Sequence, residues 1–129
     1  MKEFRRLTVW EKAHGLTLAI YHATAKFPRE ELYGLTSQMR RCSASVPANI
    51  AEGCGRTGDG DFHRFLNIAA GSLFELEYFI LLSRDLGFLP FHECKTLTED
   101  AREVTTNACF SVKKGTKQPS ASCNIGGIA

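Results

Sequence analysis

At 129 residues, 43% hydrophobic and 23% charged, with a formal net charge of +2, the chain fits one soluble domain with a single core. No apolar run reaches the roughly 18 residues of a membrane-spanning helix, and the N-terminal segment lacks the apolar core of a signal peptide, so we expect a cytoplasmic protein with no membrane partner. The five cysteines are odd in number and include no C-x-x-C pair, which argues against a disulfide framework.

The first predicted helix spans about residues 8–26. Thr8, with Glu11 three residues later, fits a capping box that starts the helix, and Pro28 ends it. Apolar or small residues recur along it at spacings of three and four, as on the buried seam of a bundle helix. These residues are Trp10, Ala13, Thr17, Ile20, Thr24 and Phe27.

The second predicted helix spans about residues 33–52 and contains a proline, Pro47. Its apolar stripe continues through the proline and consists of Leu35, Met39, Cys42, Val46 and Ile50. A proline inside a helix removes one backbone hydrogen bond and costs roughly 3 kcal/mol, so we expect a kink that the fold uses. Gly53 is predicted to be the C-terminal cap, followed by a flexible turn rich in glycine.

The third predicted helix, from about residue 61 to residue 86, is the longest, and Asp59 or Asp61 is expected to cap it. Its main stripe consists of Phe62, Phe65, Leu66, Ala69, Leu73, Leu76, Ile80 and Ser83. Further apolar residues occupy the opposite face, namely Phe74, Tyr78, Phe79 and Leu82. Such a helix is usually buried on several sides, and in a small domain the second partner is expected to be another subunit.

The fourth predicted helix has the weakest pattern. Leu97, Ala101, Val104 and Ala108 keep a helical spacing, but several threonines nearby are poor helix formers. From residue 111 onward the polar sequence predicts a disordered tail. Together these patterns predict an all-α, antiparallel up-and-down four-helix bundle over residues 1–110, with a tail over residues 111–129.

Charge is distributed unevenly along the chain. Residues 1–58 hold nine Lys/Arg against five Asp/Glu, a net of +4, whereas residues 59–110 hold four against nine, a net of −5. A basic half and an acidic half could bind a polyanion, could bind each other between copies of the chain, or could be ordinary solvated surface.

Three stretches resemble a known family: FRRLTVWEKAH at 4–14, FPREELYGLTSQMRRCSASVPANIAEGCGR at 27–56, and FHRFLNIAAGSLFELEYFILLSRDLGFL at 62–89. These are similar to the small bacterial four-helix-bundle proteins encoded in intervening sequences of 23S ribosomal RNA genes. The resemblance implies a left-handed bundle and a ring-shaped homopentamer. It also implies a likeness to accessory proteins of diversity-generating retroelements, which bind nucleic acid and a reverse transcriptase. It brings no catalytic residues with it.

The C-terminus departs from the family, which continues helix four with an apolar, basic-ended pattern. Codons for Asn107-Ala-Cys-Phe, read one base over, can spell Met-Leu-Ala-Ser, as in the family pattern. We therefore hypothesise that a frameshift has replaced the last turns of helix four, which would leave it truncated or degenerate. The idea fails if the shifted frame of the gene encodes no apolar helix.

Several motifs that suggest catalysis or cofactor binding lack the context that their chemistry requires. Gly53 to Gly58 matches G-x-G-x-x-G, but a helix precedes it where a dinucleotide site needs a strand. Cys54 and His63 have no third orienting group, and the four histidines lack metal-ligand spacing. We expect no enzyme activity, no cofactor and no metal.

The remaining candidates are basic residues that could contact phosphates. They are Arg5, Arg6, Lys12, Arg40, Arg41, Arg56 and Arg64. The alternative is that Arg40 and Arg41 pair with acidic groups of the third helix or of a neighbouring subunit. Asn49 and Glu52 are expected to satisfy backbone groups freed by Pro47 or to make a subunit contact. The favoured function is non-enzymatic binding of RNA or DNA by a small oligomer; the alternative is a protein-interaction scaffold without a nucleic-acid role.

Overall fold

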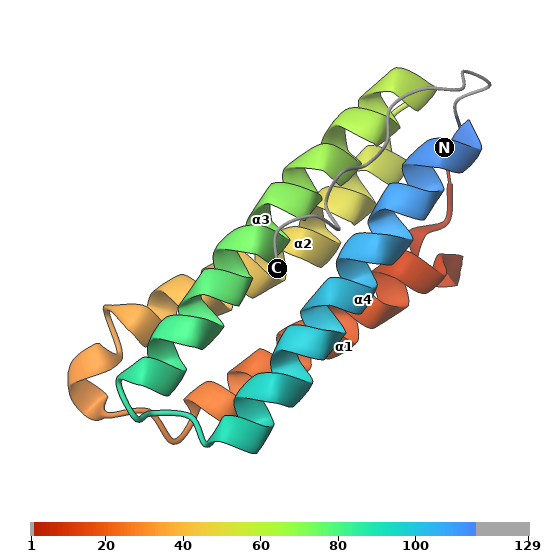
Figure 1. Cartoon of the computed structure of the whole chain (residues 1–129). Helices are drawn as coiled ribbons and strands as arrows, with labels where there is room; N and C mark the ends of the chain where they lie inside the picture. The colour runs from red at the N-terminus through yellow and green to blue at the C-terminus, as the bar shows by residue number, and fades with distance from the viewer. Residues whose placement is uncertain (1, 116–129) are drawn as a thin grey trace.

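The computed structural model describes residues 2–115 of the chain. Four long helices form it: α1 (Thr8–Thr24), α2 (Leu35–Cys54), α3 (Asp59–Asp85) and α4 (Phe91–Gly115). One-turn 3-10 helices, η1 (Phe4–Arg6) and η2 (Arg29–Glu31), precede α1 and α2. Each helix contacts the helix before and after it, and α1 contacts α4, so the helices run up and down around one core (Figure 1). The predicted all-α four-helix bundle is confirmed.

The fourth helix is not shortened. It runs for 25 residues, as far as Gly115, despite its threonines. Thr105 and Thr106 each donate a hydrogen bond from the hydroxyl to the backbone carbonyl four residues earlier, which keeps these side chains compatible with the helix. The helix therefore continues past the expected boundary at residue 110, and the predicted tail beyond residue 115 lies outside the described residues.

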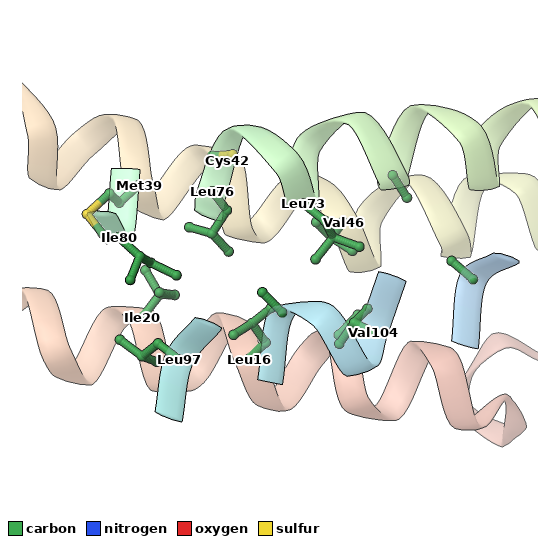
Figure 2. Close-up of a cluster of buried hydrophobic side chains, with 14 of the residues drawn as sticks. Leu16, Ile20, Met39, Cys42, Val46, Leu73, Leu76, Ile80, Leu97 and Val104 are labelled. Atoms are coloured by element: carbon green, nitrogen blue, oxygen red, sulfur yellow. The ribbon is translucent and has the colours of Figure 1, made fainter. Parts of the chain in front are cut away.

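The core consists of the stripes that the sequence indicated. The apolar stripe of α2, the main stripe of α3 and the four spaced residues of α4 are all buried, and on α1 only Trp10 is partly exposed. Figure 2 shows Leu16 and Ile20 of α1, Leu73 and Leu76 of α3, and Val104 of α4 pointing into the space between the helices. Burying one such side chain stabilises the fold by about 1.5–3 kcal/mol, so these stripes supply most of the driving force for the bundle.

The predicted N-terminal caps are wrong. Leu7 occupies the N-cap position of α1, and its carbonyl accepts the first helical hydrogen bond, from the amide of Glu11. Leu7 also packs against the core, which fixes the entry of the chain one residue before Thr8. At α3, Gly58 is the N-cap and neither Asp59 nor Asp61 makes a side-chain cap, although both place negative charge in the first turn.

Gly87 ends α3 with a positive φ of 78°. Its amide donates to the carbonyl of Arg84, and the amide of Phe88 donates to the carbonyl of Ser83. This pair of hydrogen bonds is the Schellman motif, in which glycine adopts the left-handed conformation without a Cβ clash. The motif turns the chain so that Phe88 packs on Phe27, their ring centroids 5.6 Å apart.

Pro47 is buried inside α2. It leaves one backbone carbonyl of α2 without its helical hydrogen bond, and a side chain of another helix donates to that carbonyl instead. Because proline has no N–H, the carbonyl of Ser43, four residues earlier, receives no helical hydrogen bond. The hydroxyl of Thr17 on α1 donates to that carbonyl at 2.9 Å. The proline therefore replaces a bond within α2 by a bond between α1 and α2.

α3 has a second apolar face that the described residues leave uncovered. Ile68, Phe74, Tyr78 and Leu81 are between 37% and 57% exposed. By length and composition alone α3 could cross a membrane, but core helices of soluble bundles meet the same criterion, so this is weak evidence for a span. Of the residues predicted for the opposite face, Phe74 and Tyr78 are exposed as expected, whereas Phe79 and Leu82 are partly buried and pack against the core.

Candidate nucleic-acid interface

The uneven charge of the sequence becomes a two-sided distribution in the bundle. Residues 1–58, with a net charge of +4, form α1, α2 and the segments that flank them. Residues 59–115, which form α3 and α4, hold six Lys/Arg against nine Asp/Glu because α4 continues through two lysines beyond residue 110, so this half has a net charge of −3. Because α1 packs beside α2 and α3 beside α4, one side of the molecule is basic and the other acidic. We call the basic side the α1–α2 face; its arginines are Arg5, Arg6, Arg29, Arg40, Arg41 and, at the C-terminal end of α2, Arg56.

Arg40 is engaged in holding α1 to α2. Its Nε donates to the hydroxyl of Thr24 at 2.9 Å, and its Nη2 donates to the carbonyl of Tyr21 at 3.3 Å. The guanidinium also lies over the Tyr21 ring, 4.7 Å from the centroid. A cation that binds carbonyls near a helix C-terminus is stabilised by the helix dipole, so this half-buried arginine has a structural role.

Arg40 and its neighbour provide a matched pair for measuring that role. We expect Arg40→Met to lower the free energy of unfolding by about 1 kcal/mol, because two hydrogen bonds to α1 are lost. Arg41→Met removes the same charge from an exposed site and should change stability by less than about 0.5 kcal/mol. Urea unfolding followed by circular dichroism measures both values, and equal effects would refute the structural role of Arg40.

Arg6 and Arg41 are exposed, and within residues 2–115 neither forms an ion pair or a side-chain hydrogen bond. Their guanidinium groups therefore remain available to an external anion, whereas that of Arg40 does not. The predicted pairing of Arg41 with an acidic group of α3 is not found in the described chain.

The other predicted basic residues each have an acidic partner. Arg5 pairs with Glu3 at 3.0 Å, Arg56 with Glu52 at 3.0 Å, and Arg64 with Asp61 at 3.7 Å. Lys12 of α1 pairs with Glu103 of α4 and so joins the basic half of the chain to the acidic half. Exposed pairs of this kind contribute about 0–1 kcal/mol to stability, and an external phosphate would have to compete with a carboxylate for each of them.

The predicted arginines do not form one compact site. Arg40 and Arg41 lie in the first half of α2, whereas Arg56 follows its C-terminus, which at 1.5 Å per residue is roughly 20 Å away. Arg56 and Arg64 instead lie over the same ring, that of Phe65, at 5.4 Å and 4.8 Å from its centroid. They form a cluster at the end of the bundle where α2 ends and α3 begins.

The residues around Pro47 have structural roles. The side-chain amide of Asn49 donates to the carbonyl of Ser45, and the exposed Glu52 pairs with Arg56, so neither satisfies the carbonyl that Pro47 frees. Gly53 is not a cap, because α2 continues to Cys54 and Gly55 is the C-cap. Gly53 is buried, and a Cβ built on it would lie 2.9 Å from the Cβ of Phe65 and 3.3 Å from Cδ2 of Phe62. It is glycine because α2 and α3 approach each other closely there.

Three aromatic rings beside Arg5 and Arg6, those of Phe4, Trp10 and His14, form an array that was not predicted from the sequence. The rings of Phe4 and Trp10 meet edge to face with centroids 5.0 Å apart. The rings of Trp10 and His14 stack nearly parallel, at an interplanar angle of 10° and a centroid distance of 5.0 Å. The spacing of four between Trp10 and His14 places both on one face of a helix and was the available signal.

The buried thiols of Cys42 and Cys54 lack the properties of a nucleophile. Cys54 is buried, and burial raises the pKa of its thiol, which disfavours the reactive thiolate. Burial and the nearby Glu75 raise the pKa of Cys42 to about 12. Among the described residues no three His, Cys, Asp or Glu side chains are grouped so that they could hold a metal ion.

Comparisons with known proteins identify the family. A family profile described as 23S rRNA-intervening sequence protein matches residues 5–107, and so ends where the sequence was seen to depart from the family pattern. A crystal structure of a protein of unknown function from Bacteroides thetaiotaomicron, described as belonging to the S23 ribosomal protein family, has the same fold. The two chains are 22% identical with a TM-score of 0.74, over 82% of this chain and 99% of the other. No curated protein matches the chain. Because the profile covers most of its length, this chain belongs to the 23S rRNA-intervening sequence protein family.

Proposed function

We propose that this chain is a non-enzymatic, cytoplasmic bundle protein that binds RNA or DNA through the α1–α2 face. The observation that supports this most is the pair of exposed arginines, Arg6 and Arg41, on the side of the bundle that carries the excess of positive charge. Phosphates attract such a surface, and arginine can bind a phosphate through two parallel hydrogen bonds. The ion-paired Arg56 and Arg64 are weaker candidates, because each already neutralises a carboxylate.

Two double variants with the same change of charge test the location of this surface. We expect Arg6→Ser with Arg41→Ser to weaken binding to a labelled RNA hairpin and to make it less sensitive to salt. Each lost phosphate contact should reduce the slope of log affinity against log salt by about 0.7–0.9. Arg56→Ser with Arg64→Ser should leave the slope nearly unchanged.

Fluorescence anisotropy at several salt concentrations provides the affinities. The opposite pattern, in which only the second double variant loses affinity, would move the binding surface to the cluster around Phe65. If the native chain binds neither RNA nor DNA at low salt, the proposed function is wrong.

The exposed apolar stripe of α3 supports a second candidate, a scaffold that assembles with itself, as a homopentamer, or with a partner protein. Phe74, Tyr78 and Leu81 are exposed and, at spacings of four and three, share one face of α3, and burying such a face between chains is favourable. Light scattering of the same samples, with and without RNA, separates the two functions. A stable oligomer whose mass RNA does not change, and which retains no nucleic acid, would favour the scaffold.

A further inference from the structure

The aromatic array ends in an exposed ring. His14 stacks on Trp10, and its own side chain is exposed, so the imidazole plane turned away from Trp10 is open. At the other end of the array the guanidinium of Arg5 lies 4.6 Å from the centroid of Phe4. One cationic group therefore lies at one end of a row of three aromatic rings along η1 and the first half of α1.

The part of α2 beside this array presents small side chains. The bond between Thr17 and the carbonyl of Ser43 fixes the register of the two antiparallel helices, so His14 lies level with about Val46. Near this level α2 presents Ala44, Ala48 and Ala51 at spacings of four and three, and all three are at least partly exposed. Alanine side chains are too short to cover a neighbouring ring, so the flank of the array stays accessible.

We propose that Trp10 and His14 form a stacking platform for an unpaired base, so that the ligand of the α1–α2 face is single-stranded RNA or DNA. This inference rests on the proposed function and specifies its substrate class. A base in a duplex has neighbours on both faces, whereas an unpaired base has a free face that can stack on an aromatic side chain. Arg6, next to the array, would hold the phosphate that precedes or follows the stacked base.

Binding of a base to the platform can be followed by the fluorescence of Trp10. Trp10 is the one tryptophan of the chain, so intrinsic fluorescence reports on the platform alone. We expect an oligothymidylate of about 12 nucleotides to change the emission of Trp10, and its duplex with oligodeoxyadenylate to leave the emission nearly unaltered.

Two substitutions of His14 test whether stacking contributes to binding, separately from effects on folding and on charge. His14→Ala should weaken binding of the oligothymidylate by about 5- to 100-fold, because a stacked base loses its platform. His14→Phe keeps an aromatic ring and should bind within about threefold of the native chain, since stacking tolerates a change of ring. Because His14 is exposed, both variants should keep the native circular dichroism spectrum.

The outcomes separate the platform from the proposed function. If His14→Ala binds the single strand as tightly as the native chain while the Arg6 and Arg41 double variant does not, the platform is wrong and the basic face stands. If His14→Phe loses as much affinity as His14→Ala, the imidazole acts by hydrogen bonding and stacking is refuted. If the native chain binds the duplex more tightly than the single strand, or binds neither, the inference is also wrong.

Discussion

Replacing Gly53 by alanine should destabilise the bundle, although alanine is the better helix former. The new Cβ would lie 2.9 Å from the Cβ of Phe65, an atom that cannot move without moving the backbone of α3. Overpacking of this kind costs about 1–3 kcal/mol, and the helix propensity of alanine offsets at most about 1 kcal/mol of it. We expect a net loss of about 1–2 kcal/mol for Gly53→Ala and about 3 kcal/mol for Gly53→Val, measured by urea unfolding.

Gly15 provides the matched control. It also lies inside a helix, α1, but a Cβ built on it meets nothing within 4 Å. Gly15→Ala should therefore raise the free energy of unfolding by about 1 kcal/mol, since only the propensity changes. If Gly53→Ala and Gly15→Ala shift stability in the same direction, the close approach of α2 and α3 at Gly53 does not limit packing.

Thr17→Val should cost about 1–3 kcal/mol, because it leaves the carbonyl of Ser43 buried without a donor. The effect depends on Pro47, whose missing N–H is the reason why that carbonyl needs Thr17. In a Pro47→Ala background the alanine amide can donate to Ser43, so Thr17→Val should then cost about 1 kcal/mol less. A double-mutant cycle of unfolding free energies measures this coupling.

Thr105→Val is the control for the loss of a buried hydroxyl. Thr105 is buried like Thr17, but its hydroxyl donates only to the carbonyl of Ala101, within its own helix. That carbonyl lies in the interior of α4 and does not depend on the hydroxyl, so the substitution should change stability by less than about 0.5 kcal/mol. Additive effects of Thr17→Val and Pro47→Ala would show that Thr17 does not compensate for the proline.

The helices and their buried faces could be predicted from the sequence because both depend on local spacing. The stripe through Met39 and Val46 and the stripe through Leu73 and Ile80 are buried, as the periodicity indicated. Helix α4 was harder, since its threonines bond back to their own helix and so tolerate a conformation that their propensity disfavours.

The partners of individual side chains could not be predicted, because spacing shows which face a residue occupies and not what lies opposite. Gly53 resembled a cap in the sequence, and only the position of Phe65 shows why it is glycine. Arg40 and Arg41 are adjacent in the chain, yet one binds α1 and the other faces solvent. The same limit applies to the family resemblance, which indicated the bundle without indicating which arginines remain available.

The two-sided charge of the bundle has a kinetic consequence. With net charges of +4 on the half that contains α1 and α2 and −3 on the half that contains α3 and α4, the molecule has an electric dipole across its short axis. A polyanion attracts one side and repels the other, so the protein would rotate into a productive orientation while still about a Debye length, roughly 8–10 Å, away. Added salt would then act mainly by slowing association, while the lifetime of a complex once formed would change much less.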